Sequence, residues 1–250
     1  MKHYQLQHAQ PATINHRQVF LILITSLIVS VFLGLLWLRH LQNMGRPDVH
    51  EYPILGVSVS QEDGYQDFRL LQKHGVDFVY LKATQGADYF DDSFLDNYWR
   101  LQGAQIPFGV YHYFSFSSTP QSQFANFKTS VGRQIGTLPI VIQINDYQRP
   151  RPTTKKIKQS VTQLQTLLVN YYQRKVIIQT PTIWVGLFNK RPNSSWLQAS
   201  KPPLHMEMVD FWEYSRQGQI PSLATNNLYH LSVFMGNSTR WQHYVQSGGY

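Results

Sequence analysis

Residues 56–94, GVSVSQEDGYQDFRLLQKHGVDFVYLKATQGADYFDDSF, decide the fold class of this chain. Two apolar runs, at residues 54–60 and 76–84, have the length and composition of buried β-strands. The stretch between them has helical character and ends at Lys73-His74-Gly75. Two strands joined through a helix predict a parallel β/α unit, because parallel strands need a long crossover.

The same alternation continues towards the carboxyl terminus. Helices are expected around residues 94–102 and 157–172, and the further strand-like runs are IPFGVYHYF (106–114), LPIVIQI (138–144) and KVIIQT (175–180). After Pro181 the helical signals fade, and short β-like pieces follow at residues 205–215 and 228–236. The pattern predicts an irregular β/α barrel whose closing third is rich in β-structure.

Glycine and proline mark the expected ends of these elements. Gly75 and Gly103 are each predicted to end a helix in the left-handed conformation, just before the next strand. Pro107 and Pro139 lie at the entrances of strand-like runs, where the missing N–H costs least.

An apolar segment precedes the predicted barrel. Residues 19–38, VFLILITSLIVSVFLGLLWL, contain no charge and are long enough to cross a hydrocarbon core of about 30 Å. Arg39 and His40 follow in place of a cleavage site, so we expect an uncleaved transmembrane anchor. Basic residues flank both ends, and charge alone does not set the orientation. The predicted division is a cytoplasmic tail at residues 1–18, a span at 19–38, a linker at 39–53 and a barrel domain at 54–250.

The composition narrows the class of protein. With 42% hydrophobic and 14% aromatic residues, the chain can bury a substantial core. It contains no cysteine, which excludes disulfides and thiolate metal sites. The formal charge of +8 favours polyanionic surroundings such as nucleic acid, anionic lipid or wall phosphates, without choosing among them. No cofactor and no metal site is expected.

The opening stretch resembles the start of the family-25 glycoside hydrolases, the N-acetylmuramidases or lysozymes of phages and bacteria. Their motifs there are Gly-Ile-Asp-Val-Ser and Lys-Ala-Thr-Glu-Gly. Further matches in family order are GVYHYF (109–114), LPIVIQIND (138–146), KVIIQTP (175–181) and WEYSRQGQIP (212–221). The resemblance implies an α/β fold, an irregular TIM-like (β/α) barrel of the family-25 lysozyme type, with its glycan groove at the carboxyl ends of the strands.

Neutral side chains occupy the positions at which the family carries its catalytic carboxylates. The Asp-x-Glu motif of the fourth strand is matched by Gln143-Ile144-Asn145. Ser58 matches the Asp of the opening motif, and His230 matches the Asp of the last strand. The Glu of Lys-Ala-Thr-Glu-Gly is replaced by Gln85. The resemblance therefore implies the fold more securely than the activity.

Amides cannot replace these carboxylates in glycoside cleavage. The leaving oxygen needs a proton donor, and the cationic transition state needs a nearby negative charge. Gln143 and Asn145 offer only hydrogen bonds. Asp146 is no substitute, because residues i and i+2 of a strand share a face and Asp146 points to the other one. Loss of a general acid alone costs about 10²–10⁴ in rate, so at most trace hydrolysis is expected.

The same positions are well suited to sugar binding. Amides both donate and accept hydrogen bonds, and aromatic rings pack on the apolar faces of pyranoses. The residues expected to bind glycan are Gln85, Tyr111, Tyr113, Gln143, Asn145, Trp212 and Tyr214. For Tyr111 and Tyr113 the alternative is packing in the core, and His112 between them is expected to be structural.

Relocated acids are the alternative to an inactive groove. Glu62 and Asp63 follow the first strand near its mouth and are the candidates for a displaced acid pair. His230 could act as a weak acid, but the sequence names no carboxylate partner for it. Glu213 stands where the family usually has Gln, and we expect it on the outer face of its strand.

Two charged clusters have an ordinary and a functional interpretation. Asp88, Asp91 and Asp92 suit a solvated turn that caps a helix, with a cation site as the alternative. The basic cluster after the fourth strand suits a solvated loop, with a contact to wall phosphate as the alternative; it comprises Arg149, Arg151, Lys155, Lys156 and Lys158.

Three functions remain open at this point. The chain is a membrane-anchored domain that binds peptidoglycan or a wall glycopolymer without cleaving it, a weak muramidase with a relocated acid, or an assembly partner of other envelope proteins. The resemblance implies a single-pass membrane protein with its carboxyl-terminal domain outside a bacterial cell, and no nucleic-acid partner. Protein partners are not identified by the sequence.

Overall fold

The computed structural model describes residues 16–42, 45–147, 151–188, 195–203, 209–220, 223, 225 and 227–250. The chain divides between residues 44 and 45 into two compact units. The segment predicted as a linker is shared between them. Residues 39–42 continue the amino-terminal helix, and residues 45–53 belong to the second unit.

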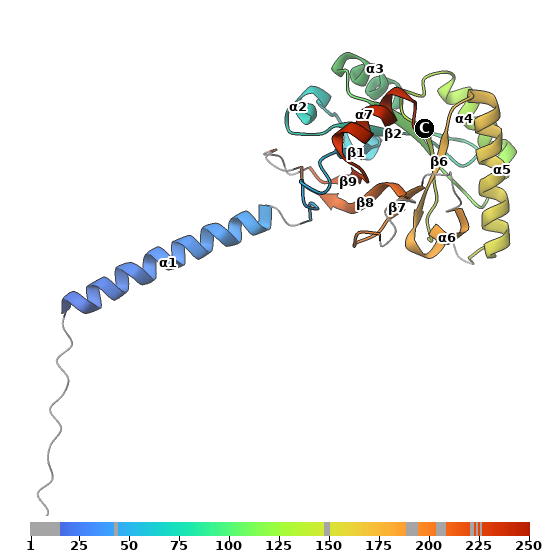
Figure 1. The fold of residues 1–250 in the computed structure, drawn as a ribbon. Helices are drawn as coiled ribbons and strands as arrows, with labels where there is room; N and C mark the ends of the chain where they lie inside the picture. Colours follow the sequence, from blue (N-terminus) through green and yellow to red (C-terminus); the bar gives the residue numbers. More distant parts are fainter. Residues whose placement is uncertain are drawn as a thin grey trace, which may run out of the picture. The chain divides into compact units, whose positions relative to one another are not determined.

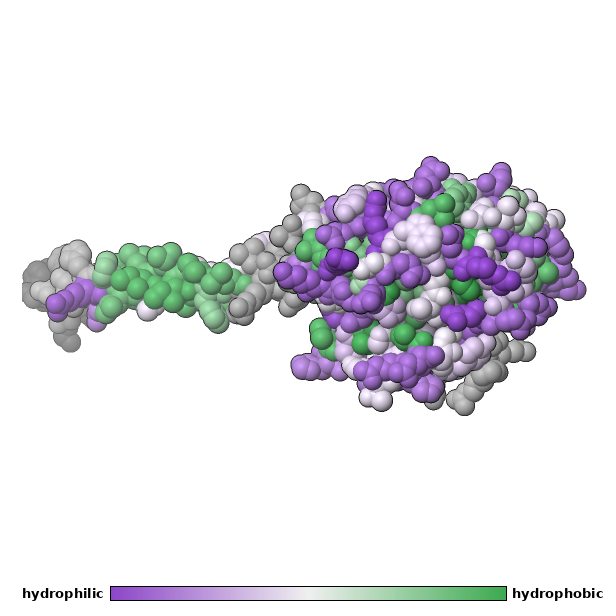
Figure 2. Space-filling model, turned by 90° about the horizontal axis from the view of Figure 1, so that it is seen from above, coloured by the Kyte–Doolittle hydropathy of each residue, from purple (hydrophilic) through white to green (hydrophobic). Residues whose placement is uncertain are grey.

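The amino-terminal unit contains helix α1 (His16–Gln42). Its segment Arg17–Leu35 has a mean hydropathy of 2.5, and none of it is buried against protein. The visible surface of this segment is almost wholly hydrophobic (Figure 2). By length and composition the helix can cross a membrane, and a signal sequence near the amino terminus would have the same properties.

The second unit is built around one closed sheet (Figure 1). Its barrel strands are β1 (Leu55–Val59), β2 (Phe78–Gln85), β4 (Phe108–Tyr113), β5 (Ile140–Gln143), β6 (Val176–Pro181), β7 (Ser195–Gln198), β8 (Val209–Gly218) and β9 (Tyr229–Phe234). The spatial order is β1-β9-β8-β7-β6-β5-β4-β2, and a parallel pairing of β1 with β2 closes the ring. Strand β9 is antiparallel to both neighbours. The predicted irregular barrel is confirmed.

Helices surround the barrel, and one of them, α7 (Ser238–Gln246), closes its lower end. The others are α2 (Phe68–Lys73), α3 (Phe94–Ala104), α4 (Pro120–Val131), α5 (Thr154–Tyr172) and α6 (Val185–Phe188), with 3₁₀ turns η1 (Gln61–Asp63) and η2 (Thr182–Trp184) and a short strand β3 (Tyr89–Phe90) paired to β2. Helix α5 shows why such segments are helical. Thr153 caps its first turn by accepting from the Lys156 N–H, and Ile157, Val161 and Leu164 bury one face.

Three helices, one strand and one helix end differ from the sequence prediction. Helices α4, α6 and α7 and strand β7 were not predicted, although Thr119 and Asn237 cap α4 and α7 with side-chain oxygens. Gly75 is left-handed as expected, with φ of 86°. The prediction for Gly103 was wrong, because α3 runs on to bury Ala104 and the left-handed residue is Gln105, with φ of 59°.

Strand alternation separates the two largest of three hydrophobic clusters. One lies between the sheet and the surrounding helices and includes the strand residues Val57, Ala83 and Ile142. The other fills the barrel interior and is largely aromatic; its strand members are Phe78, Tyr80, Tyr111, Val141, Ile177, Trp196, Phe211 and Phe234. The interior is therefore a packed core and not a channel.

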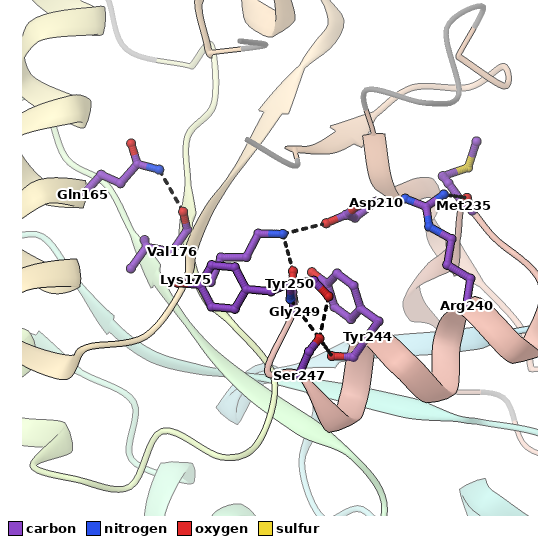
Figure 3. A network of polar contacts seen from close by, with 10 residues as sticks. All are labelled: Gln165, Lys175, Val176, Asp210, Met235, Arg240, Tyr244, Ser247, Gly249 and Tyr250. Atoms are coloured by element: carbon purple, nitrogen blue, oxygen red, sulfur yellow. Dashed lines mark hydrogen bonds and ion pairs between the residues drawn. The ribbon is translucent and has the colours of Figure 1, made fainter. Parts of the chain in front are cut away.

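The carboxyl-terminal segment closes the bottom of the barrel. Trp241 and Tyr244 of α7 pack into the interior core. Beside them the Lys175 ammonium donates to Asp210 (3.4 Å) and to the Gly249 carbonyl, so β6, β8 and the chain end are tied together (Figure 3). Arg240 donates to the other carboxylate oxygen of Asp210, at 3.3 Å. This polar network holds the end of the chain against the lower rim.

The close packing of the interior predicts that Gly56 is needed. A Cβ added there would lie 2.1 Å from the Phe78 ring, which is fully buried. Gly56→Ala should lower the free energy of unfolding by about 1–3 kcal/mol, measured by urea denaturation. Gly103→Ala is the control, since its Cβ meets nothing within 4 Å inside α3, and it should leave stability unchanged or raise it by about 0.5–1 kcal/mol. Equal effects at both positions would contradict this packing.

Candidate functional site

A polar layer lies above the aromatic interior, at the carboxyl ends of the parallel strands. Counting in steps of two from the interior core residues gives a set of inward-facing polar side chains. Lys82 and His230 are partly exposed, and the other six are buried: Ser58, Gln143, Gln179, Gln198, Glu213 and Ser232. Such a layer is not needed for packing, because aliphatic residues would fill it more favourably. It forms the floor of the site.

An open cleft of about 670 Å³ lies over this floor. It is lined by Tyr113, Gln143, Asn145, Tyr147, Gln198, Tyr214, Ser215, Arg216, Gln217 and His230. The lining comes from the ends of β4, β5, β7, β8 and β9. The side chains that line the cleft are mainly aromatic rings and amides. No Asp or Glu is among the described lining residues.

Glu213 is a carboxylate directly beneath the cleft, and the expectation that it faces outwards was wrong. It follows Phe211 by two residues, so it faces the interior, and its side chain is 1% exposed. One carboxylate oxygen accepts from the Gln179 amide at 2.7 Å and lies 3.7 Å from His230 Nδ1. The other oxygen accepts from Arg216 Nε at 3.2 Å. Glu213 therefore provides the carboxylate partner that His230 lacked in the sequence.

Arg216 extends this network along the cleft wall. Its guanidinium donates through NH2 to Gln198 Oε1 at 2.8 Å and through NH1 to the Tyr147 hydroxyl. With the bond to Glu213, three of its five N–H groups are held by β7, β8 and the loop after β5. The side chain remains 40% exposed. It is a fixed cation at the surface of the cleft.

Comparison with known proteins agrees with this geometry. The model of the glycosyl hydrolases family 25 matches residues 57–223, well over half of the chain. The chain belongs to this family. It is 27% identical to lysozyme M1 of Streptomyces globisporus over 68% of the chain, and the matched part spans 65% of that relative's length. It is also 26% identical to the uncharacterized protein YegX of Escherichia coli K12, over 78% of the chain and 74% of the relative.

Solved family-25 structures share the fold. A family 25 glycosyl hydrolase from Bacillus anthracis superposes with a TM-score of 0.69 at 27% identity, covering 80% of this chain and 96% of the other. The lysozyme from Streptomyces coelicolor gives a TM-score of 0.66 at 21% identity, covering 78% and 98%, which shows the fold alone.

The structure brings together several side chains that the sequence comparison predicts at catalytic positions of the family. Gln143, Asn145 and His230 all line the cleft. Ser58 is 7% exposed and is the direct cross-strand partner of His230 in the β1–β9 ladder. Asp146 forms an ion pair with Arg151 and is not among the lining residues, as the strand alternation predicts.

The predicted glycan-binding residues of this family-25 domain are divided between cleft and core. Tyr113 and Tyr214 line the cleft. Tyr111 belongs to the interior core. Trp212 is 3% exposed, packs edge-on against Tyr52 and donates its indole N–H to the Ala199 carbonyl, so it supports the wall from behind. Gln85 ends β2 beside Tyr113 in the ladder and is not a lining residue.

The two candidate relocated acids lie in the turn after β1. Asp63 accepts hydrogen bonds from the Ser60 N–H (2.7 Å) and the Ser60 hydroxyl (3.1 Å), which makes it part of a capping box. Burial raises the pKa of Asp63, while the hydrogen bonds from Ser60 and the nearby His230 lower it. Glu62 is exposed. Neither is among the residues that line the cleft.

No described member of the other two charged clusters lines the cleft. Asp91 is fully buried and accepts from the backbone N–H groups of Gln61 and Ser93, so it ties the turn after β1 to the start of α3. Among the described residues, no group of three or more His, Asp or Glu could hold a metal ion. In the basic cluster, Arg151, Lys155, Lys156 and Lys158 are exposed, and Arg149 lies outside the described residues.

His112 is a buried structural residue behind the site. Its Nδ1 lies 2.8 Å from the Thr84 hydroxyl and its Nε2 lies 2.9 Å from Gln123 Oε1, an arrangement that fits a neutral ring. Burial lowers the pKa of His112 to about 4, although the bond to Gln123 opposes the shift. The burial of His112 follows from the alternation of side chains along β4. Its ring faces α4, whereas Tyr111 and Tyr113 face inwards.

This histidine predicts an acid-sensitive fold. The unfolded chain protonates His112 near pH 6.5, whereas the folded chain does so only near pH 4. Stability should therefore fall by about 3 kcal/mol as the pH drops through this window, with no contribution from His112 above it. His112→Gln should flatten that part of the stability profile, measured by urea unfolding at each pH. The exposed His243→Gln is the control, and identical slopes for wild type and His112→Gln would refute the assignment.

Proposed function

We propose that this chain is a membrane-anchored, wall-facing family-25 domain that binds peptidoglycan or an associated wall polymer without hydrolysing it. The observation that carries the proposal is the cleft itself, whose described lining residues include amides and tyrosines and no carboxylate. A cleft of this size and composition suits a sugar chain, since each amide and hydroxyl can hydrogen-bond to hydroxyl or N-acetyl groups.

The absence of hydrolysis follows from the chemistry of these side chains. Glycoside cleavage needs one carboxyl group to protonate the leaving oxygen and a second carboxylate near the sugar ring. Gln143 and Asn145 can supply neither function, because an amide does not transfer a proton in the accessible pH range. Glu213 is enclosed by Gln179, Arg216 and His230, and its 1% exposure keeps it from a sugar in the cleft.

A weak muramidase is the second candidate function, and one observation favours it. His230 lines the cleft, and its Nδ1 lies 3.7 Å from the Glu213 carboxylate. A carboxylate beside one ring nitrogen can favour proton transfer at the other. This pair is a better candidate for a relocated acid than Glu62 and Asp63, which do not line the cleft. It still lacks a carboxylate open to the positive charge that develops on the sugar.

Binding and turnover should separate when both are measured on one sample. The full chain in detergent is incubated with purified bacterial wall, sedimented, and assayed for bound protein and new reducing ends. We expect wild type to co-sediment and to release reducing ends at least 10²-fold more slowly than an active lysozyme on the same wall. Release close to that of the active enzyme would overturn the inactive assignment, and its loss in His230→Asn would point to the His230–Glu213 pair.

A matched pair of variants controls for binding through the cleft. Gln143→Leu/Asn145→Leu removes the hydrogen-bonding groups of the groove and should abolish most of the co-sedimentation. Gln121→Leu/Gln159→Leu changes two exposed amides on α4 and α5 and should have no effect. Equal binding by both double variants would place the wall contact outside the cleft.

We further infer that α1 anchors the domain, with the amino terminus in the cytoplasm and the barrel outside. Because the chain has no cysteine, single introduced thiols report topology directly. In protoplasts, a membrane-impermeant maleimide should label Gln159→Cys without lysis and Thr13→Cys only after lysis. The protein should also remain in the membrane fraction after carbonate extraction. The opposite labelling, or release into the medium, would contradict the anchor.

A further inference from the structure

The cleft presents positive charge where the family motif places carboxylates. Its described lining includes Arg216 and the ionisable ring of His230, with exposed side-chain fractions of 40% and 43%, and no acidic residue. Lys82 adds a cation at the edge, with its ammonium 5.7 Å from the ring centroid of the lining residue Tyr113. Positive groups at a binding surface attract anionic rather than neutral ligands.

Arg216 is held in place before any ligand binds. Glu213, Gln198 and Tyr147 take one N–H each, from Nε, NH2 and NH1 respectively. Two of the five guanidinium N–H groups, one on NH1 and one on NH2, are left over from these bonds. A guanidinium fixed in this way loses little side-chain entropy on binding and offers donors that match a carboxylate or phosphate.

Glu213 reduces the positive potential of Arg216, but it lies deeper, so the guanidinium is the charged group nearer to a ligand in the cleft. The Glu213 side chain is 1% exposed, whereas the guanidinium lies at the surface of the cleft. The pair therefore acts as a dipole whose positive end faces the cleft. The positive charge of Arg216 also acts on the cleft wall, since it lowers the pKa of the Tyr113 phenol against the larger opposing effect of burial.

We propose that Arg216 binds an anionic substituent of the wall glycan, a carboxylate or a phosphate, so that the domain selects acidic polymer over neutral glycan. This proposal rests on the proposed function and specifies its ligand class. A carboxylate would come from the sugar or the peptide of peptidoglycan, and a phosphate from a wall polymer attached to it. Both accept two N–H groups of a guanidinium side by side.

The experiment compares three wall preparations that differ only in their anions. The full chain in detergent is co-sedimented with untreated wall, with wall stripped of its phosphate polymers by hydrofluoric acid, and with stripped wall whose carboxylates have been amidated by carbodiimide. A loss of wild-type affinity at the first treatment assigns phosphate, and a loss at the second assigns carboxylate. We expect a loss of about tenfold or more at one of these steps.

Two variants at one position test the role of Arg216, and a third controls for net charge. Arg216→Gln should bind untreated wall about tenfold more weakly than wild type and should not distinguish the three preparations. Arg216→Lys keeps the charge without the planar fork and should fall between them. Arg69→Gln removes the same charge on α2, outside the cleft lining, and should behave as wild type. Far-ultraviolet circular dichroism checks that each variant is folded.

The outcomes distinguish a failure of the anion preference from a failure of the proposed wall-binding function. If wild type binds all three walls equally, or if Arg216→Gln binds as wild type does, the anion preference is wrong while glycan binding stands. If Arg69→Gln weakens binding as much as Arg216→Gln, the effect is one of net charge and the cleft assignment is wrong. If wild type binds no wall preparation, the proposed function fails and this inference fails with it.

Discussion

The arrangement of this molecule depends on one constraint, the alternation of side chains along strands that close into a ring. Once Phe78, Trp196 and Phe211 fill the interior, every second residue above them must also face inwards. That requirement places Gln143, Gln179 and Glu213 in one polar layer, although they are far apart in the sequence. The cleft lies at the open end of this layer. The residues that stand two positions beyond the aromatic core on their strands determine which ligands the cleft can bind.

The same constraint explains what the sequence could predict. The barrel and the inward position of Gln143 and Asn145 follow from short apolar runs and their period of two. Helix α4 was missed because its apolar face is short, although Thr119-Pro120 is a strong start signal. Gly103 was assigned to a helix end because glycine is common there, but burial of Ala104 carries α3 past that position.

The site itself was harder to predict than the fold. Trp212 and Tyr111 are aromatic residues in matched motifs, and only packing shows that they support the cleft without lining it. Glu213 was assigned to the wrong face because the parity of β8 could not be fixed without knowing that Phe211 is interior. Arg216 carried no signal at all, since its importance comes from contacts with Gln198 and Tyr147, which lie outside its own strand.

The pairing of β1 with β9 has a consequence for how the domain is made. Leu55 lies opposite Val233, so the first and last strands of the domain are neighbours in the ring. Together with α7, which plugs the lower end, this means that the barrel cannot close until nearly the whole chain has been synthesised. A loop of this length is slow to form because its entropy must be lost before the long-range contacts compensate. The nascent domain therefore remains an open sheet, with the edge of β1 unpaired on the β9 side, until β9 and α7 have left the ribosome.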